Sequence, residues 1–221
     1  MKENNLFAYY ESNDKMEIGF SNKNFNFERF FKDKKYAILK QIHSNIVLDV
    51  SAPVKFPEGD GLITSEKRLY LIIKTADCFP VIAYNLEAGF VAALHAGWRG
   101  VYKNIFKEFK KKAIELGTNR SVMDSNTNFI IGPGICGKCY EVGRSFYYDF
   151  KMIGFGEEFF RTEGDKVYFY VRGAIERRLY ELNFDSDNIK NINLCTYENQ
   201  NLFSYRRDKT KSRLYNFIRL K

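Results

Sequence analysis

The chain has 221 residues, of which 45% are hydrophobic and 28% are charged, with a formal net charge of +8 at pH 7. This apolar content excludes an intrinsically disordered chain, and the length suits one folded domain over residues 1–221. No run approaches the ~20 apolar residues that a membrane helix needs, and residues 1–15 lack the apolar core of a signal peptide. We therefore expect a cytoplasmic protein with no membrane partner and with its four cysteines reduced.

The net positive charge has two interpretations. One is a solvated basic surface, typified by Lys107, Lys110, Lys111 and Lys112 on one predicted helix. The other is attraction of an anionic substrate such as phosphate or a nucleotide. The basic residues are spread along the chain and form no recognised nucleic-acid-binding motif, so we expect no nucleic-acid partner.

Apolar runs in the first half of the chain predict β-strands. They cover residues 16–20, 36–50, 69–74, 79–84 and 90–95. The second run is broken near His43, and the turn at residues 85–89 predicts that the last two runs form a hairpin.

Helical periodicity begins after the run that ends at His95. The apolar residues from Val101 to Leu116 share one helix face, and Gly117 is a plausible C-cap. Further along, we predict a polar loop at 118–128, a strand at 129–131, helices at 141–151 and 174–182, and closing strands at 191–195, 202–205 and 214–220. The irregular alternation of strands and helices favours a mixed α+β or α/β fold.

The two histidines of the whole chain, His43 and His95, each lie at the end of an apolar run, and Cys78 occupies a third such position. Imidazole nitrogen and thiolate sulfur are preferred zinc ligands, and three protein ligands leave a position open for water or substrate. The spacings of 35 and 17 residues form no compact metal-binding motif. From spacing alone, two unrelated histidines and one buried cysteine remain a valid alternative.

Longer segments around these positions are more specific. They are Lys40–His43 (KQIH), Gly59–Thr64 (GDGLIT), Thr75–Val81 (TADCFPV), Ala93–Gly100 (ALHAGWRG), Ile131–Pro133 (IGP), Cys139–Gly143 (CYEVG), Cys195–Tyr197 (CTY) and Phe203–Asp208 (FSYRRD). In this order, they resemble the YfiH/laccase-domain family over nearly the whole chain. Members of that family are variously described as polyphenol oxidase, purine nucleoside phosphorylase or peptidoglycan editing factor.

The resemblance implies a layered sandwich of mixed β-sheets flanked by helices, with the site in a cleft between sheets. It puts the metal ligands on His43, Cys78 and His95, which with Asp77 are the expected catalytic residues. It implies a zinc-dependent purine nucleoside phosphorylase that also acts on methylthioadenosine and deaminates adenosine. The expected partners are a purine nucleoside and phosphate, and we expect a monomer or a weak homo-oligomer.

Phosphate binding requires cationic side chains. Arg99 and Arg206 are the candidates, with Lys40 a weaker one. The family's usual Thr-Gly-Arg near the C-terminus is Thr210-Lys211-Ser212-Arg213 in this chain, a departure that concerns the phosphate or ribose contacts of this tail.

Three further residues have two interpretations each. Asp77 is either the acceptor that orients a metal-binding histidine or a turn residue at a strand end. Asp60 is either a general acid/base or the turn former of Gly-Asp-Gly. Trp98, the one tryptophan of the chain, either stacks on the base or packs beneath the following turn.

Other chemistries remain as alternatives. A blue-copper-like site also uses two His and one Cys, but two histidines are too few for the further coppers of a laccase, so Cu²⁺ binding would be adventitious. The same metal centre suits an amidase that edits peptidoglycan precursors, or a structural zinc closed by Cys139 or Cys195. Cys136-Gly-Lys-Cys139 is a C-x-x-C, which alone suggests a redox pair or half a zinc site, but the sequence has no second C-x-x-C to complete a zinc site. Cys139 belongs to a segment that matches the family, so Cys136 is interpreted as incidental.

Overall fold

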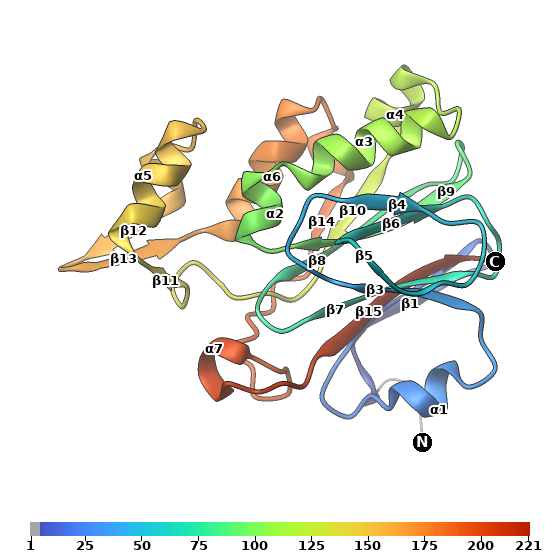
Figure 1. The fold of residues 1–221 in the computed structure, drawn as a ribbon, viewed down its shortest axis with the longest axis horizontal. Coiled ribbons are helices and arrows are strands. Elements are labelled where there is room, and N and C mark those ends of the chain that lie inside the picture. Colours follow the sequence, from blue (N-terminus) through green and yellow to red (C-terminus); the bar gives the residue numbers. More distant parts are fainter. Residues whose placement is uncertain (1–4) are drawn as a thin grey trace.

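Two six-stranded sheets stack face to face in the structure, a computed structural model that describes residues 5–221 (Figure 1). The first sheet has the order β1 (Phe7–Ser12), β2 (Met16–Ser21), β15 (Leu214–Leu220), β7 (Tyr70–Thr75), β3 (Tyr36–Lys40) and β5 (Lys55–Glu58). The second has the order β14 (Ile189–Asn191), β10 (Asn128–Ile131), β8 (Phe79–Asn85), β9 (Phe90–Ala96), β6 (Gly61–Thr64) and β4 (Val47–Asp49). Both sheets contain parallel and antiparallel pairs, as the expected mixed fold requires.

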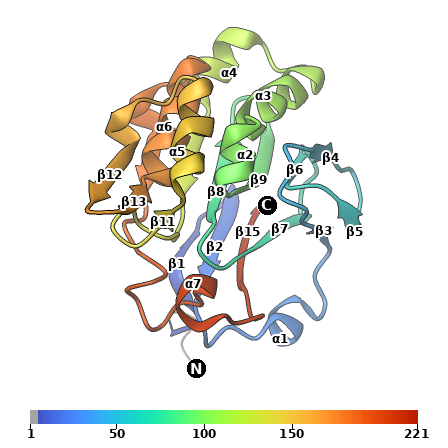
Figure 2. The same ribbon diagram turned by 60° about the vertical axis from the view of Figure 1, so that its left-hand side comes forward.

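Helices cover the outer faces of these sheets. Most lie over the second sheet: α2 (Trp98–Tyr102), α3 (Ile105–Glu115), α4 (Arg120–Asn126) and α6 (Val171–Glu181) (Figure 1). The short α1 (Phe27–Phe31) packs on the first sheet. At one side, α5 (Arg144–Met152) packs on a third sheet of β11 (Glu141–Val142), β13 (Lys166–Phe169) and β12 (Phe160–Glu163) (Figure 2). The final helix is α7 (Tyr205–Asp208).

The buried strands are apolar on both faces because both faces are covered. In β9, Ala92 and Leu94 pack toward the helices, whereas Val91 and Ala93 pack between the two sheets. This two-residue alternation divides the core into a helix–sheet layer and a sheet–sheet layer. The layered sandwich implied by the sequence is therefore confirmed.

The predicted hairpin is confirmed as β8 and β9, which pair antiparallel over their whole length. Pro80 pairs with His95, and Cys78 directly precedes β8. The hairpin therefore brings a cysteine and a histidine to the same end of the second sheet.

Several predicted elements were wrong. The polar loop at 118–128 contains α4, whose first turn is capped by the Asn119 side chain and which buries Met123. The predicted strand at 202–205 is a loop that leads into α7, capped by Ser204. The strand predicted at 191–195 is also wrong, because β14 already ends at Asn191. Beyond it, Cys195 forms a single β-bridge with Gly134.

The helix predicted from Val101 is divided, because Asn104 adopts a left-handed conformation and caps α3. Gly117, which was predicted to cap this helix, follows α3 in a left-handed conformation with a φ of +91°. The short elements β1, α1, β5, β6, β12 and β13 had no counterpart in the predicted strands and helices.

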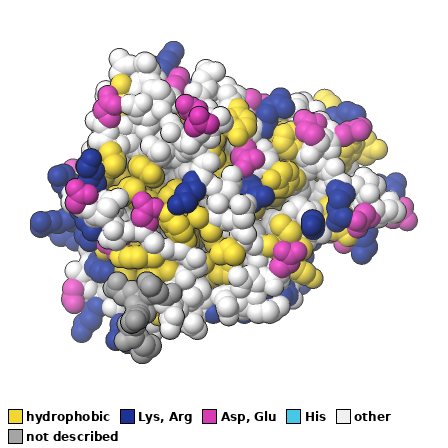
Figure 3. Space-filling view, turned by 180° about the vertical axis from the view of Figure 1, so that it is seen from behind, with side chains coloured by type: hydrophobic (Ala, Val, Ile, Leu, Met, Phe, Trp, Pro, Cys, Tyr) yellow, Lys and Arg dark blue, Asp and Glu magenta, His cyan; other side chains and the backbone are white. Residues whose placement is uncertain are grey.

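Charges of both signs are interspersed on the face drawn in Figure 3, with hydrophobic side chains between them. This face therefore carries no continuous basic surface. Among residues 5–221, none of the helices combines the length and hydrophobicity that a membrane crossing requires.

A buried carboxylate stabilises the first sheet. Glu17 of β2 accepts hydrogen bonds from Tyr10, Tyr70 and Arg219 at 3.0, 2.8 and 2.8 Å. Burial raises the pKa of Glu17, but these hydrogen bonds outweigh burial and lower the pKa below its usual 4.5. Because the unfolded chain binds this proton more tightly, the carboxylate stabilises the fold above pH 4.5, and that contribution is lost as the pH falls below it.

We expect Glu17→Gln to lower the free energy of unfolding at pH 7 by about 2 kcal/mol, because charged hydrogen bonds are replaced by neutral ones. Urea unfolding at pH 7 and at several lower pH values measures this. The difference between the variant and the wild type should shrink as the pH falls below 4.5. A difference that stays constant with pH would contradict the assignment.

Candidate metal centre

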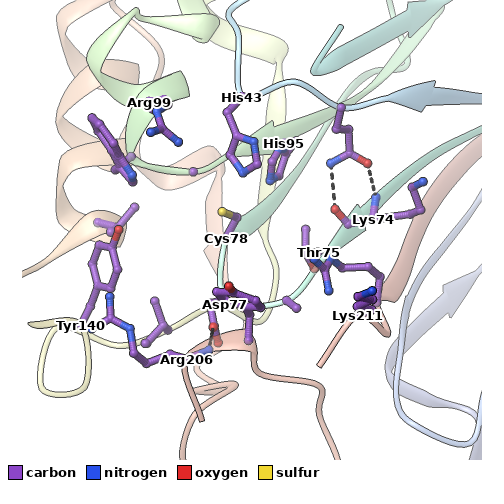
Figure 4. A pocket seen from close by; sticks show the side chains of 18 of the residues that line it. His43, Lys74, Thr75, Asp77, Cys78, His95, Arg99, Tyr140, Arg206 and Lys211 are labelled. Atoms are coloured by element: carbon purple, nitrogen blue, oxygen red, sulfur yellow. Dashed lines mark hydrogen bonds between the residues drawn. The ribbon is translucent and has the colours of Figure 1, made fainter. Parts of the chain in front are cut away.

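His43, Cys78 and His95 converge, and one ligand atom from each lies within 4.8 Å of the others (Figure 4). His43 comes from the loop between β3 and β4, Cys78 from the loop between β7 and β8, and His95 from β9. The two imidazole rings lie 4.9 Å apart between centroids at an angle of 69°. His95 is buried, Cys78 is half-buried and His43 is exposed, so the cluster opens to solvent on one side.

Asp60 holds this cluster in place. Its fully buried carboxylate lies 2.7 Å from Nδ1 of His95. The backbone N–H groups of Ile42, His43 and Ser44 also donate to it, at 3.2, 3.0 and 2.6 Å. Burial raises the pKa of Asp60, but the hydrogen bonds from His95 and Ser44 outweigh burial and lower it to about 2. An ionised carboxylate accepts the Nδ1 proton, which leaves Nε2 of His95 as the nitrogen for a metal.

The same carboxylate fixes the loop that carries His43. His43 has a φ of 57°, a left-handed conformation that side chains other than glycine rarely adopt. The hydrogen bonds from three consecutive N–H groups to Asp60 hold the loop in this conformation. Such backbone strain is common at functional sites.

Cys78 and His95 shift each other's pKa. Burial lowers the pKa of His95, but Cys78 and Asp60 raise it to about 9. Burial raises the pKa of Cys78, but His95 and His43 lower it to about 6. Both shifts favour a Cys78 thiolate beside a protonated His95, and a cation that binds there would displace the His95 proton.

The donor set fits Zn²⁺. Zinc binds imidazole nitrogen and thiolate sulfur at about 2.0–2.3 Å, so a group of ligand atoms this close needs little movement to share one ion. The close approach of Gly97 to the cluster also fits a metal site. A Cβ at Gly97 would lie 2.7 Å from the Cys78 sulfur and 3.7 Å from His43 Cδ2. The chain thus has a residue without a side chain where it passes the cluster.

We expect Gly97→Ala to weaken zinc binding roughly 10–100-fold, the range seen when the groups that orient metal ligands are removed. Gly97 has a φ of −80° and a ψ of 172°, which alanine adopts freely, so the collision with Cys78 is the expected cause. Competition with a chromophoric chelator measures the affinity.

Gly143→Ala is the matched control, because Gly143 has a similar conformation and a Cβ there meets nothing closer than Ser145 at 3.8 Å. Equal zinc affinities for the two alanine variants would contradict a role for the space beside Cys78.

Asp77 does not have the role of orienting a histidine. Its carboxylate accepts hydrogen bonds from Thr196 Oγ1 at 2.8 Å and from the backbone N–H of Arg206 at 2.7 Å. The acceptor of His95 is Asp60, for which a general acid/base or turn role was expected. Asp77 instead joins the loop before β8 to the C-terminal segment and keeps a place in the pocket lining.

A cavity of about 1160 Å³ opens over the cluster at strand ends of both large sheets. Its lining combines cations, aromatic rings and the metal-site residues. The cations are Lys40, Lys74, Arg99, Arg206, Lys209, Lys211 and Arg213, and Asp77 is the acidic residue among the described lining residues. This surface is strongly positive, unlike the face of mixed charge in Figure 3.

The cations lie on both sides of the cluster. In Figure 4, Arg99, Arg206 and Tyr140 lie on one side, and Lys74 and Lys211 lie on the other. The guanidinium of Arg99 lies 4.6 Å from the Trp98 ring, and that of Arg206 lies 5.1 Å from the Tyr140 ring. The structure thus brings Arg99, Arg206 and Trp98 into the pocket, whereas Lys40, also at its edge, is paired with Glu58 at 2.8 Å.

Tyr140, Lys74 and Lys211 had no role in the sequence interpretation. Both Tyr140 and Lys211 could have been singled out from the sequence. Tyr140 belongs to the segment Cys139–Gly143 that resembles the family, and Lys211 belongs to the tail that departs from the family pattern. Lys74 ends an apolar run and had no such signal. Burial, and then the charge of Arg213, lowers the pKa of Lys74, as expected for crowded cations.

Cys136, which was interpreted as incidental, has two other cysteines beside it. Its sulfur forms a second cluster with those of Cys139 and Cys195, again with ligand atoms within 4.8 Å of one another. Cys139 and Cys195 belong to this second cluster, so neither is placed as a fourth ligand beside Cys78.

The family described as multi-copper polyphenol oxidoreductase laccase matches residues 5–221 of this sequence. The chain belongs to this family. Its curated relatives include proteins named purine nucleoside phosphorylase. One from Campylobacter jejuni is 34% identical over 195 residues, which are 86% of this chain and 80% of the relative. One from Aquifex aeolicus is 33% identical over 207 residues, 90% of this chain and 89% of the relative.

Solved structures share the fold. The hypothetical protein YfiH of Bacillus licheniformis superimposes with a TM-score of 0.84 at 20% identity, covering 97% of this chain and 100% of that one. YlmD from Geobacillus stearothermophilus gives a TM-score of 0.84 at 20% identity, covering 98% of this chain and 99% of that one. These two likenesses show the fold, and the family match over residues 5–221 bears out the resemblance of the sequence segments.

Proposed function

We propose that this protein is a zinc-dependent purine nucleoside phosphorylase with its active site in the cationic cavity. The observation that carries the proposal is the cluster of His43, Cys78 and His95, which opens into a cavity lined by cations and aromatic rings. The relatives named purine nucleoside phosphorylase support the reaction class. Zn²⁺ is proposed over Cu²⁺, and copper would bind adventitiously because it competes well at most nitrogen and sulfur sites.

His43, Cys78 and His95 would hold the zinc, and Asp60 would orient His95. Bound zinc would supply Lewis-acid polarisation of a substrate oxygen or of water. Three protein ligands leave room for such a group, as in catalytic rather than structural sites.

The cations of the cavity bind phosphate in this proposal. Arg99 and Arg206 offer guanidinium groups, which match phosphate geometry. Lys74 and Lys211 on the other side of the cluster add charge and steer anions into the cavity. Phosphorolysis then forms a bond from phosphate oxygen to C1′ of the ribose while the bond from C1′ to the base breaks.

The departing base takes the electron pair of that bond and needs a proton or a hydrogen bond. Burial, and then the charge of Cys78, raises the pKa of Tyr140 to about 12, so its phenol stays protonated at neutral pH. We assign Tyr140 as a hydrogen-bond donor to substrate and Trp98 as a surface for the base, since both line the cavity. Asp77 would help to position Arg206 through its backbone.

The test combines metal analysis of the purified protein with chromatography of adenosine incubated with and without phosphate. Adenine that forms with phosphate and not without it is the expected result. Inosine without phosphate would show the deaminase activity, and the same assay with methylthioadenosine tests that substrate. No turnover of any nucleoside, with hydrolysis of a muramyl peptide instead, would overturn the proposal in favour of precursor editing.

We expect Arg99→Gln to raise the KM for phosphate roughly 10–100-fold, because a charged hydrogen bond contributes about 1.5–3 kcal/mol. Steady-state kinetics at varied phosphate and saturating adenosine measure this. Lys111→Gln is the control, because it removes the same charge from the exposed surface of α3. Equal phosphate KM values for both variants would contradict the role of Arg99.

A further inference from the structure

The second cysteine cluster joins two segments that are far apart in the sequence. Cys136 and Cys139 lie in the segment after β10, and Cys195 lies in the segment after β14. A parallel bridge between Gly134 and Cys195 aligns the two segments, and Thr196 N–H donates to the Gly134 carbonyl at 3.1 Å. All three sulfurs are half-buried and unpaired by disulfides.

Both segments turn in the same way. In Cys136-Gly-Lys-Cys139, the N–H groups of Cys139 and Tyr140 donate to the Cys136 carbonyl at 3.0 and 3.1 Å. In Cys195-Thr-Tyr-Glu198, the N–H of Asn199 donates to the Cys195 carbonyl at 2.9 Å. A C-x-x-C turn therefore faces a C-x-x-E turn, and the N–H of Cys136 donates to the Cys195 sulfur at 3.3 Å.

An exposed carboxylate lies at the edge of this cluster. Oε1 of Glu198 lies 3.7 Å from the Cys139 sulfur. Glu198 stands outside the group of three sulfurs that lie within 4.8 Å of one another, so its side chain would turn toward them to share an ion. Three thiolates and this carboxylate would then make four ligands with no open position, the ligand number of structural zinc sites. The sequence interpretation sought a second C-x-x-C, and Glu198 stands at the position where such a motif beginning at Cys195 would have its last cysteine.

We propose that Cys136, Cys139, Cys195 and Glu198 form a second, structural Zn²⁺ site. Binding releases the thiol protons to solvent. Three thiolates this close would repel one another without a cation between them. With zinc, three thiolates and the carboxylate leave a net negative charge, and Arg172 lines the small pocket that borders Cys136, Cys195 and Glu198.

The site would hold together the two chain segments that lead into the wall of the active-site cavity. The first segment continues into Tyr140, which lines the cavity. The second continues into Thr196, whose hydroxyl donates to Asp77. Arg207 of α7 also donates to the carbonyls of Thr196 and Tyr197, at 2.8 and 2.7 Å. Zinc at the cluster therefore supports the wall that carries Tyr140 and Arg206.

The test counts zinc in protein purified under reducing conditions. The Cys78→Ser variant should keep one equivalent of zinc, held by the second site. Adding Cys139→Ser to that variant should remove this equivalent, whereas adding Lys138→Ser, which alters the same turn without a ligand, should leave it. A Cys78→Ser protein without zinc, or a bound zinc that survives Cys139→Ser, would overturn the proposal.

A second measurement avoids variants that fail to fold. Co²⁺ added to metal-free Cys78→Ser protein should give a thiolate-to-cobalt charge-transfer band of three-thiolate intensity. The band should lose no thiolate intensity in Glu198→Gln, although the affinity for Co²⁺ should fall. A missing band in reduced protein, or an intact mass lower by two hydrogens that reports a disulfide within the cluster, would overturn the proposal. Neither readout depends on nucleoside turnover, so this site can fail while the proposed phosphorylase stands.

Discussion

Cys78→Ser is expected to lose the zinc of the active site and to lower adenosine phosphorolysis by on the order of 10³-fold. The loss should exceed the ~10–100-fold that follows removal of an outer hydrogen-bond partner, because a direct ligand is lost. Serine keeps the size of the side chain, but its hydroxyl stays protonated at neutral pH and is a poor zinc ligand. Metal analysis and chromatography of the products measure the two effects.

Urea unfolding provides the control for this variant, since a folded protein with the wild-type unfolding slope excludes global disruption. His43→Gln and His95→Gln should behave in the same way if the three ligands act as one site. A Cys78→Ser protein that keeps full activity would refute the assignment of the active site.

The second large effect is expected for Asp60→Asn. This carboxylate is fully buried and accepts hydrogen bonds from His95, from three backbone N–H groups and from the Ser44 hydroxyl. The amide NH₂ of asparagine would face one of these donors, so we expect a loss of about 3 kcal/mol in the free energy of unfolding. Zinc affinity should fall roughly 10–100-fold as His95 loses its orienting partner.

The pH dependence of unfolding checks the physical cause. The pKa of Asp60 falls from 3.8 to about 2 on folding, so its contribution is complete above pH 3.8 and is lost as the pH falls through about 2. The destabilisation by Asp60→Asn should shrink over this range. Asp49→Asn, at the exposed end of β4, is the matched control and should change stability by less than about 0.5 kcal/mol.

Most buried strands of the main sheets could be predicted from apolar runs, and the family resemblance predicted that His43, Cys78 and His95 converge, but the partner of His95 could not be predicted. Asp77 is adjacent to Cys78 in the chain and was the natural candidate. The pairing of Gly61 with Leu94 decides otherwise, because it aligns β6 with β9 and puts Asp60 beside His95. Such long-range register leaves no signal in the local pattern of either strand.

The same limit explains the other differences. The bridge between Gly134 and Cys195 assembles the second cysteine cluster across a large separation in sequence. The helices α4 and α7 are short and polar, so apolar periodicity does not reveal them. Their signals were the capping residues Asn119 and Ser204, which also occur in ordinary loops.

The two ends of the β8–β9 hairpin should respond differently to insertions and deletions. Its turn lies about 20 Å along the strands from Pro80 and His95, given ~3.3 Å per residue. A Cβ at Gly89 in that turn would meet nothing within 4 Å, so a peptide tag inserted there has room. Deleting one residue of β9 before His95 would instead turn His95 to the opposite face of its sheet and take it out of the cluster with His43 and Cys78.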